Sequence, residues 1–397
     1  MKKALLLIGS LQMLLFGEQA FAICNDATLS GHPKFGYDLQ EIMLNEGDHS
    51  RIVSVMQRAI KGERMVVAAI GGSITAGANA SDFKTRSYSA LVYQWWTDKF
   101  GNASIEYVNA GIGATTSIYG VHRAERDLLR YDPDFTIVEF SVNDNGLGAR
   151  CEESYEGLIR KILIHRPKSA LLSIASVNRK LENVEERHLK ICQHYGIPML
   201  SVKRMLAPKI ASRQVIWSDW SDDDVHPNDE GHAVMAGMIV DYLERCYREA
   251  VSGQKASFRK RLPAPLTANV FEHSEVRDAG NLAPAEPGGW TVVSQQGYWD
   301  HSWSADCEER PLVFKLKARS IIIGYRKNIV PTKGKLIIKV DGVQVREIDA
   351  NFPNGWGNYV ENESVFRDDR SREHTVELTY VGEPGEPIYV KYLLVSE

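Results

Sequence analysis

Cysteine is scarce in this 397-residue sequence, and long runs of a single charge are absent. The five cysteines are widely spaced with no Cys-x-x-Cys pair, which argues against a zinc site. Their odd number leaves at least one thiol unpaired, and the pairing of the others cannot be read from the sequence. The net charge of −4 and the lack of a basic run exclude an electrostatic signature of nucleic-acid binding. We therefore expect no metal and no nucleic-acid partner.

Long hydrophobic runs are also missing, except at the N-terminus. Lys2 and Lys3 precede an apolar stretch over residues 4–16, and Ala20-Phe21-Ala22 supplies small residues for cleavage. This pattern predicts a signal peptide over 1–22, cleaved after Ala22. The stretch is shorter than the roughly 20 apolar residues of a membrane span. The sequence thus predicts a secreted or periplasmic protein without a membrane span.

The remaining chain changes character near residue 253. Residues 23–252 form the first part, in which apolar strands alternate with amphipathic helices, a pattern that predicts a parallel sheet covered on both faces. Strands are expected at 65–70, 104–111, 135–144, 169–176 and 197–202, and helices at 49–63, 88–101, 119–131, 153–167, 181–196 and 227–251. Residues 253–266 are basic, contain proline and are interpreted as a linker.

The second part, residues 267–397, is rich in β-branched and aromatic residues. Short runs of this kind are separated by Gly, Pro, Asn and Asp, and the Asp341-Gly342 pair lies between two alternating runs, as in a hairpin. We expect an all-β jelly roll or β-sandwich. Its aromatic residues can stack on sugar rings or belong to the core, and both interpretations stay open for four tryptophans: Trp290, Trp299, Trp303 and Trp356.

Polar or glycine-rich segments follow three of the expected strands. They are Gly71-Gly72-Ser73, residues 109–114 and residues 141–144; a fourth polar segment, residues 222–228, precedes the last helix. Because ligands bind outside the carboxyl ends of parallel strands, we expect the four segments to converge. Each segment alone is weak, since turns and helix caps use the same residues.

Together, the four segments contain what serine-based ester cleavage needs. Ser73 offers a hydroxyl, His226 can remove its proton, and Asp223, three residues before the histidine, can orient the imidazole. Backbone amides of Ser73 and of the second segment, with the side chain of Asn143, can stabilise an oxyanion. Other templates fit less well, since Thr75 breaks the Gly-x-Ser-x-Gly elbow and Ala78 stands where a P-loop has lysine.

At these segments the sequence resembles the SGNH (GDSL-type) hydrolase superfamily, over about residues 65–251. The motifs that carry the resemblance are "GGSITAG", "VNAGIGATTS", "VEFSVND" and "DDVHPND". It implies a three-layer α/β/α, flavodoxin-like domain without a cofactor. It also implies Ser73 as the nucleophile, His226 as the general base, Asp223 as its orienting acid, and Ser73 and Asn143 as oxyanion donors.

The sequence departs from the family pattern at three positions. Gly72 replaces the usual aspartate, as in a Gly-Gly-Ser-Ile-Thr branch, and Ser141 replaces the glycine that begins the third motif. Ala114 stands where the family has its oxyanion glycine. Its backbone N–H can serve, although Gly111 or Gly113 can supply the amide in its place.

These residues and the resemblance predict an exported serine esterase that removes acetyl or another small acyl group from a polysaccharide or glycoside. The acylated carbohydrate is the expected partner, and Trp217 and Trp220 are expected to line its pocket. An O-acyltransferase with the same triad, or a non-catalytic carbohydrate-binding protein on this fold, are the alternatives. Three histidines in expected helices are interpreted as structural: His122, His188 and His194.

Overall fold

The computed structural model describes residues 34–254, 256–258, 261–294, 299–307, 310–331 and 334–397. The expected signal peptide, 1–22, lies outside the described residues. The chain divides into two compact units, which are described separately below. One comprises the chain up to Ser117 with Asp127–Tyr155 and Ile162–Leu266, and the other comprises Ile118–Arg126, Glu156–Lys161 and Thr267–Glu397.

The first unit is built on a six-stranded sheet with the order β1-β6-β5-β4-β2-β3. Its strands are β1 (Met43–Asn45), β2 (Met65–Gly71), β3 (Ile105–Gly111), β4 (Phe135–Glu139), β5 (Ala170–Ala175) and β6 (Met199–Ser201). The strands β2 to β6 are parallel and have the flavodoxin-like order, which confirms the expected fold class. The antiparallel edge strand β1, paired with β6, is an addition that the sequence pattern did not indicate.

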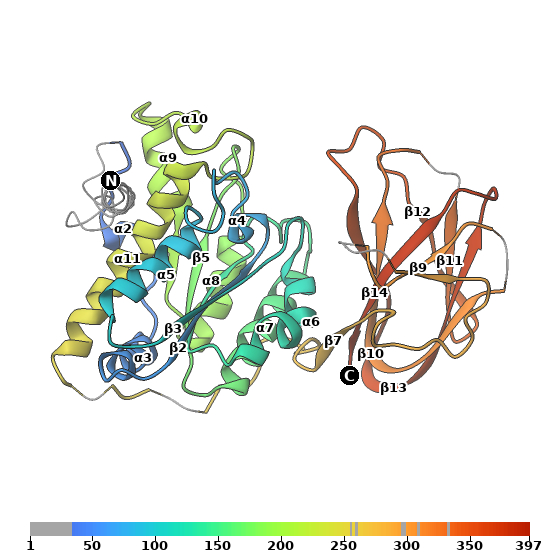
Figure 1. The fold of residues 1–397 in the computed structure, drawn as a ribbon, viewed down its shortest axis with the longest axis horizontal. Coiled ribbons are helices and arrows are strands. Elements are labelled where there is room, and N and C mark those ends of the chain that lie inside the picture. Colours follow the sequence, from blue (N-terminus) through green and yellow to red (C-terminus); the bar gives the residue numbers. More distant parts are fainter. Residues whose placement is uncertain (1–33, 255, 259–260, 295–298, 308–309, 332–333) are drawn as a thin grey trace, which may run out of the picture. The chain divides into compact units, whose positions relative to one another are not determined.

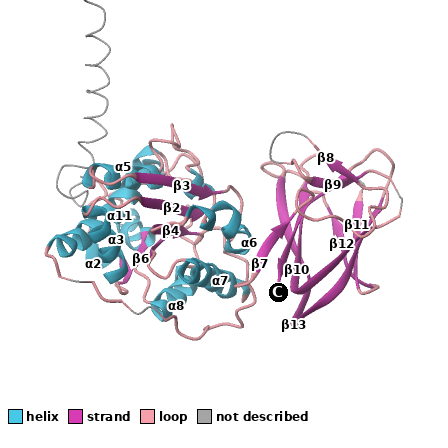
Figure 2. Cartoon of the chain, turned by 60° about the horizontal axis from the view of Figure 1, so that its bottom comes forward, coloured by secondary structure: helices cyan, strands magenta, loops and turns pink. Residues whose placement is uncertain are grey.

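Helices cover both faces of this sheet (Figures 1 and 2). The helices of the described residues are α2 (Leu39–Ile42), α3 (Ser50–Ile60), α4 (Ser73–Ala76), α5 (Tyr88–Lys99), α6 (Ser117–Asp127), α7 (Arg150–His165), α8 (Glu185–Tyr195), α9 (Val202–Ala211), α10 (Trp217–Trp220) and α11 (Asp229–Val251), with a short 3-10 turn at Leu129–Tyr131. Most of α6 and part of α7 are assigned to the second unit. The helix α9 was not expected, because Pro208 inside it normally marks a break.

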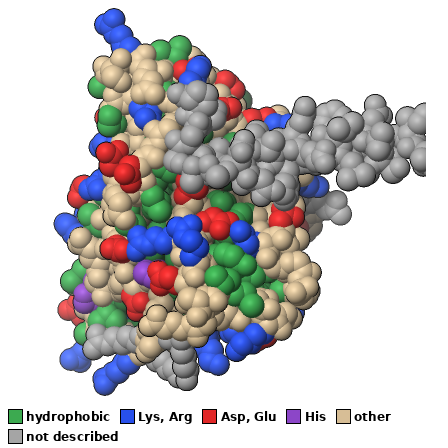
Figure 3. All heavy atoms as spheres, turned by 90° about the vertical axis from the view of Figure 1, so that its left-hand side faces the viewer, with side chains coloured by type: hydrophobic (Ala, Val, Ile, Leu, Met, Phe, Trp, Pro, Cys, Tyr) green, Lys and Arg blue, Asp and Glu red, His purple; other side chains and the backbone are tan. Residues whose placement is uncertain are grey.

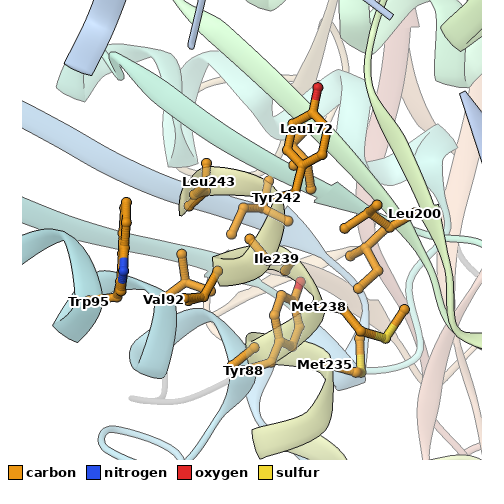
Figure 4. Close-up of a cluster of buried hydrophobic side chains, with 14 of the residues drawn as sticks. Tyr88, Val92, Trp95, Leu172, Leu200, Met235, Met238, Ile239, Tyr242 and Leu243 are labelled. Atoms are coloured by element: carbon orange, nitrogen blue, oxygen red, sulfur yellow. The ribbon is translucent and has the colours of Figure 1, made fainter. Parts of the chain in front are cut away.

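Alternation along the strands separates two buried faces. Met65, Val67 and Ala69 of β2 belong to a core shared with α3, α5 and α11, while the residues between them are buried as well. Figure 4 shows Tyr88 of α5 and Met238 of α11 in this core. Burial of both strand faces explains why β2 reads as a continuous apolar run rather than an alternating one.

From Thr267 onward the second unit is antiparallel and all-β, as expected. Its strands are β7 (Ser274–Arg277), β8 (Thr291–Val293), β9 (Ser302–Ala305), β10 (Leu312–Lys327), β11 (Lys335–Val340), β12 (Val343–Asp349), β13 (Tyr359–Val381) and β14 (Ile388–Ser396). The order is β12-β11-β13-β10-β14-β9-β8, with β7 beside β14. Positive φ angles of 52° at Asp341 and 78° at Gly342 form the predicted hairpin turn between β11 and β12.

The tryptophans of the second unit divide between core and surface. Trp290 and Trp303 are buried with the inward-facing residues of the strands, whereas Trp356 is 70% exposed and stacks on Tyr359 at a centroid distance of 5.2 Å. The core interpretation therefore holds for two of the four tryptophans.

The surface drawn in Figure 3 carries basic and acidic side chains interspersed with one another. Ion pairs on the first unit join such side chains, for example Arg64 with Glu106 at 2.6 Å. Within the described residues, no helix is both long enough and apolar enough to cross a membrane.

Replacing Trp96 tests the packing of α5 on the sheet. Its indole is fully buried and lies 5.0 Å from the ring of Phe100 and 5.5 Å from that of Phe135, between centroids. We expect Trp96→Ala to lower the free energy of unfolding by about 3–5 kcal/mol, because a large cavity replaces the ring. Urea denaturation measures this, with Ile164→Ala at a 47% exposed position of α7 as the control. The control is expected within about 0.5 kcal/mol of wild type, and equal midpoints for both variants would contradict the packing argument.

Candidate active site

Ser73 lies at the junction of β2 and α4, where two glycines make the approach possible. A Cβ on Gly71 would lie 2.0 Å from Oγ1 of Thr75 and 2.4 Å from the carbonyl oxygen of Glu139. Only glycine fits there, since real Cβ atoms do not approach backbone so closely. The helix α4 begins at Ser73 and ends at Ala76, and its C-cap residue Gly77 has a φ of 89°, in the left-handed region. The serine is thereby held at the strand tip.

The loop before α11 brings His226 and Asp223 to this serine. Nε2 of His226 lies 2.8 Å from Oγ of Ser73, and Nδ1 lies 2.7 Å from Oδ2 of Asp223. The carboxylate accepts a hydrogen bond from the N–H at Nδ1, so the unprotonated Nε2 of the ring can accept the proton of the serine hydroxyl. The structure thus places the three predicted residues in one hydrogen-bonded chain.

Asp223 is held in its ionised form by its own loop. Burial raises the pKa of its carboxyl group, but hydrogen bonds from the backbone and imidazole of His226 and from the backbone of Val225 outweigh this effect and lower the pKa below its usual value. The two backbone N–H groups donate to Oδ1 over 2.6 Å from His226 and 2.7 Å from Val225. Oδ2 is left for the imidazole, which is what an orienting carboxylate requires.

The two tryptophans of α10 differ in their surroundings. The indole N–H of Trp217 donates to the carbonyl oxygen of Asp223 over 2.6 Å, so this half-buried side chain fixes the acidic loop. A pocket-lining role for Trp217 stays a prediction. Trp220 is fully buried against Phe35, with ring centroids 6.1 Å apart. The expectation that Trp220 lines the pocket is therefore wrong, because the single turn of α10 directs it into the core.

Asn143 lies in the turn after β4, directly over the backbone of Gly72. A Cβ at position 72 would be 2.7 Å from Oδ1 and 3.1 Å from Cγ of Asn143. That oxygen is buried and has no hydrogen-bond partner within the described part of the chain. The missing side chain of Gly72 therefore makes room for the Asn143 amide beside Ser73.

The sequence left the amides of Gly111, Gly113 and Ala114 as candidate oxyanion donors, and the structure reduces this choice. The N–H of Gly111 donates to Oδ1 of Asn109 over 2.8 Å, and the N–H of Ile112 donates to the carbonyl of Gly71 over 3.1 Å. The amides of Gly113 and Ala114 follow, and a Cβ on Gly113 would lie 3.8 Å from Cβ of Ser73. Ala114 has a φ of 56°, a left-handed conformation that favours glycine. Ala114 therefore adopts a backbone conformation that is more usual for glycine, and the N–H of Gly111, already bonded to Asn109, is excluded as the oxyanion donor.

Ser141 takes the place of the glycine in the third motif for a structural reason. Its buried hydroxyl lies 2.8 Å from Oε1 of Glu139 and 3.0 Å from the carbonyl of Ser176. The Glu139 carboxylate also accepts the backbone N–H of Ser141 over 3.0 Å. Burial raises the pKa of Glu139 against these hydrogen bonds. The serine therefore closes the turn that carries Asn143.

His232 is a neighbour of the site that the sequence did not indicate, because it lies inside the apolar pattern of α11. Its Nδ1 accepts the backbone N–H of Tyr88 over 3.3 Å, so Nε2 carries the proton and lies 3.1 Å from the carbonyl of Ala78. Burial lowers the pKa of His232 to about 4, against the opposing effects of Ala78 and Asp229. This neutral ring joins α11 to the segment after Ser73 and to the start of α5.

Asp144, Cys151 and His188 are the one described group whose atoms could together ligate a metal ion, within 4.8 Å of one another. All three are buried. Through its contact with Asp144, His188 lies beside the turn that carries Asn143.

The chain is similar to known acylhydrolases and esterases. The model of the GDSL-like Lipase/Acylhydrolase family matches residues 69–234. A two-domain esterase (CEX) active on acetylated mannans is 32% identical with a TM-score of 0.83, covering 91% of this chain and 98% of that chain. Its structure with mannopentaose gives 31% and 0.82, covering 91% and 99%. Thioesterase 1/protease 1/lysophospholipase L1 of Escherichia coli K12 is 22% identical over 201 residues, 49% of this chain and 89% of the relative.

The contact between Gly72 and Asn143 can be tested by adding one methyl group. We expect Gly72→Ala to displace the Asn143 amide and to lower kcat for p-nitrophenyl acetate by up to about 10²-fold, the usual effect of losing one oxyanion donor. Gly101→Ala is the matched control, because a Cβ there meets nothing within 4 Å. Wild-type kcat in a folded Gly72→Ala protein would show that Asn143 does not act where the structure places it.

The protonation of His232 should be visible in stability. The unfolded chain binds a proton at this histidine below a pH of about 6.5, whereas the folded protein does so only near pH 4. Stability from this group is therefore present above pH 6.5 and is lost as the pH falls toward 4, by at most about 3 kcal/mol. Urea midpoints of wild type and His232→Gln, measured from pH 7 to 4, should converge on acidification. A constant difference would refute the assignment, and exposed His273→Gln serves as the control.

Proposed function

Because the chain belongs to the GDSL-like lipase/acylhydrolase family and is an esterase of the SGNH type, we propose that it removes acetyl or another small acyl group from a polysaccharide or glycoside. The observation that carries this proposal is the chain of hydrogen bonds from Asp223 through His226 to Ser73. The likeness over both units to an esterase active on acetylated mannans makes acetylated mannan the first substrate to test.

The first step forms an acyl-enzyme. Oγ of Ser73 attacks the ester carbonyl carbon while Nε2 of His226 takes the hydroxyl proton, a transfer favoured by their 2.8 Å separation. The negative charge that develops on the carbonyl oxygen is stabilised by the backbone N–H of Ser73, an amide of the Gly113–Ala114 pair and the Asn143 side chain. The tetrahedral intermediate collapses, the C–O bond to the sugar breaks, and the imidazolium returns its proton to the leaving sugar oxygen.

The second step releases the acid. A water molecule gives a proton to Nε2 of His226 and attacks the acyl carbon, and the second tetrahedral intermediate expels Oγ of Ser73, which regains its proton from the imidazolium. The ionised Asp223 stabilises the imidazolium in both steps, consistent with its lowered pKa. The sequence of steps needs no metal or organic cofactor. An acyltransferase would differ only in the acceptor, with a sugar hydroxyl in place of water.

Export belongs to the proposal as well. It rests on the charged start, apolar stretch and small residues of 1–22, which lie outside the described residues. An extracytoplasmic esterase would meet polymeric acetylated glycans that do not enter cells.

Removing the nucleophile is the decisive test of the function. We compare the protein from residue 23 onward with its Ser73→Ala variant in acetate release from p-nitrophenyl acetate, acetylated mannan and acetylated xylan. Ser73→Ala is expected to lose about 10⁴-fold or more in kcat, because the residual rate of such sites comes from binding and the oxyanion hole alone.

The control is Ser212→Ala, at an exposed position after α9, which should keep wild-type rates. Equal rates for wild type and Ser73→Ala would refute the serine mechanism. Acyl transfer to an added oligosaccharide at the expense of acetate release would favour the transferase alternative.

A further inference from the structure

We propose that Asp144 and His188 are positioning residues that hold the two oxyanion loops in register, an inference that rests on the proposed esterase function. The two side chains do not touch Ser73. They act through the loop after β3 and through the turn that carries Asn143.

Asp144 joins two segments that are far apart in the sequence. It follows Asn143 directly, and its own N–H donates to the carbonyl of Phe140 over 3.0 Å, which closes the turn. Oδ1 of its fully buried carboxyl group accepts the backbone N–H of Ser117 over 2.8 Å. Ser117 is the first residue of α6 and follows the Gly113–Ala114 pair by three residues. One carboxylate thus fixes both loops.

His188 of α8 holds the second oxygen of this carboxylate. Its Nε2 lies 2.9 Å from Oδ2 of Asp144, and both side chains are almost completely buried. The imidazole stacks on the ring of Tyr155 with centroids 3.8 Å apart and 9° between the planes. The hydroxyl of Tyr155 lies 2.7 Å from that of Ser173 in β5. Asp144 is therefore connected to strand β5 of the central sheet through His188 and Tyr155.

A backbone hydrogen bond also joins the start of α8 to the same turn. The N–H of Val184 donates to the carbonyl of Ser141 over 2.9 Å. The turn from Ser141 to Asp144 is thus bonded at both ends to the region of α8.

This anchoring matters because the Asn143 side chain has little else to fix it. Its buried Oδ1 has no hydrogen-bond partner among the residues that the structure describes, and it packs on the backbone of Gly72. A shift of about 1 Å in a catalytic group can cost 10²-fold in rate. The backbone anchor next to Asn143 therefore decides whether its amide meets the oxyanion.

The alternative use of the same side chains is a metal site with Cys151. One observation disfavours it: both oxygens of Asp144 already have partners at hydrogen-bond distance.

The test is a double-mutant cycle in the full chain, measured as kcat and KM for p-nitrophenyl acetate. His188→Phe keeps a ring against Tyr155 but loses the donor to Asp144, and we expect kcat to fall about 10–100-fold with KM within about threefold of wild type. His188→Gln restores a donor and should recover part of kcat. Asn143→Ala should lower kcat by about 10²–10³-fold.

The combination Asn143→Ala/His188→Phe should be slower than Asn143→Ala alone by a smaller factor than His188→Phe produces in the wild type, because part of the effect of His188 passes through Asn143. Multiplied effects of the two substitutions in folded protein would overturn the proposal. His194→Gln, in the same helix α8 and bonded to the carbonyl of Ala264, is the control and should leave kcat unchanged. Loss of wild-type activity on treatment with EDTA would also overturn the proposal, in favour of the metal site.

Failure of this inference can be separated from failure of the proposed function. If Ser73→Ala keeps its activity, the esterase mechanism itself is wrong. If Ser73→Ala is inactive while the effects of His188→Phe and Asn143→Ala multiply, only the positioning role fails.

Discussion

The close approach of three strand ends around Ser73 is the constraint on which the site depends. Gly71 lies against Thr75 and the backbone of Glu139, and a Cβ on Gly111 would lie 2.3 Å from the backbone nitrogen of Ala76. At both positions a side chain would push β2, β3 and β4 away from α4. The carboxyl ends of parallel strands lie at one edge of the sheet. Glycine at these positions allows the backbone there to pack closely, so that Ser73, the Asn143 side chain and two loops lie next to one another.

The electrostatics of the site follow from this compactness. One carboxylate, Asp223, is kept ionised by donors from its own loop, and its partner imidazole therefore presents Nε2 to the serine. The neighbouring His232 differs, because its Nδ1 accepts the backbone N–H of Tyr88 and burial lowers its pKa, so this ring resists protonation. Two histidines separated by six residues thus differ in function according to what faces their ring nitrogens, which is the general way in which environment assigns roles to identical side chains.

Much of this could be predicted from the sequence, because the chemistry lies at strand ends that periodicity makes visible. The parallel sheet, the all-β region from Thr267 onward and the four converging segments needed only apolar runs, glycines and short motifs, whereas the flavodoxin-like strand order followed from the family resemblance. Trp220 was misjudged because one helical turn decides whether a side chain faces a pocket or the core, and no periodicity exists over four residues. The edge strand β1, His232 and the contact of Asp144 with Ser117 depend on partners that are distant in sequence, so local patterns carry no signal for them.

The departures from the family pattern are linked by the same geometry. Asn143 occupies the space that a Cβ at position 72 would need, so the amide can take this position only because glycine replaces the usual aspartate. The hydroxyl of Ser141 bonds to Glu139 in the strand below the turn, and thus supplies a contact that a glycine lacks. Ala114 adopts a left-handed φ of 56°, which costs of order 1 kcal/mol or more and persists only where the surroundings impose it. The carboxylate of Asp144 accepts the N–H of Ser117, three residues after Ala114, and this contact is one that can hold the loop in its conformation.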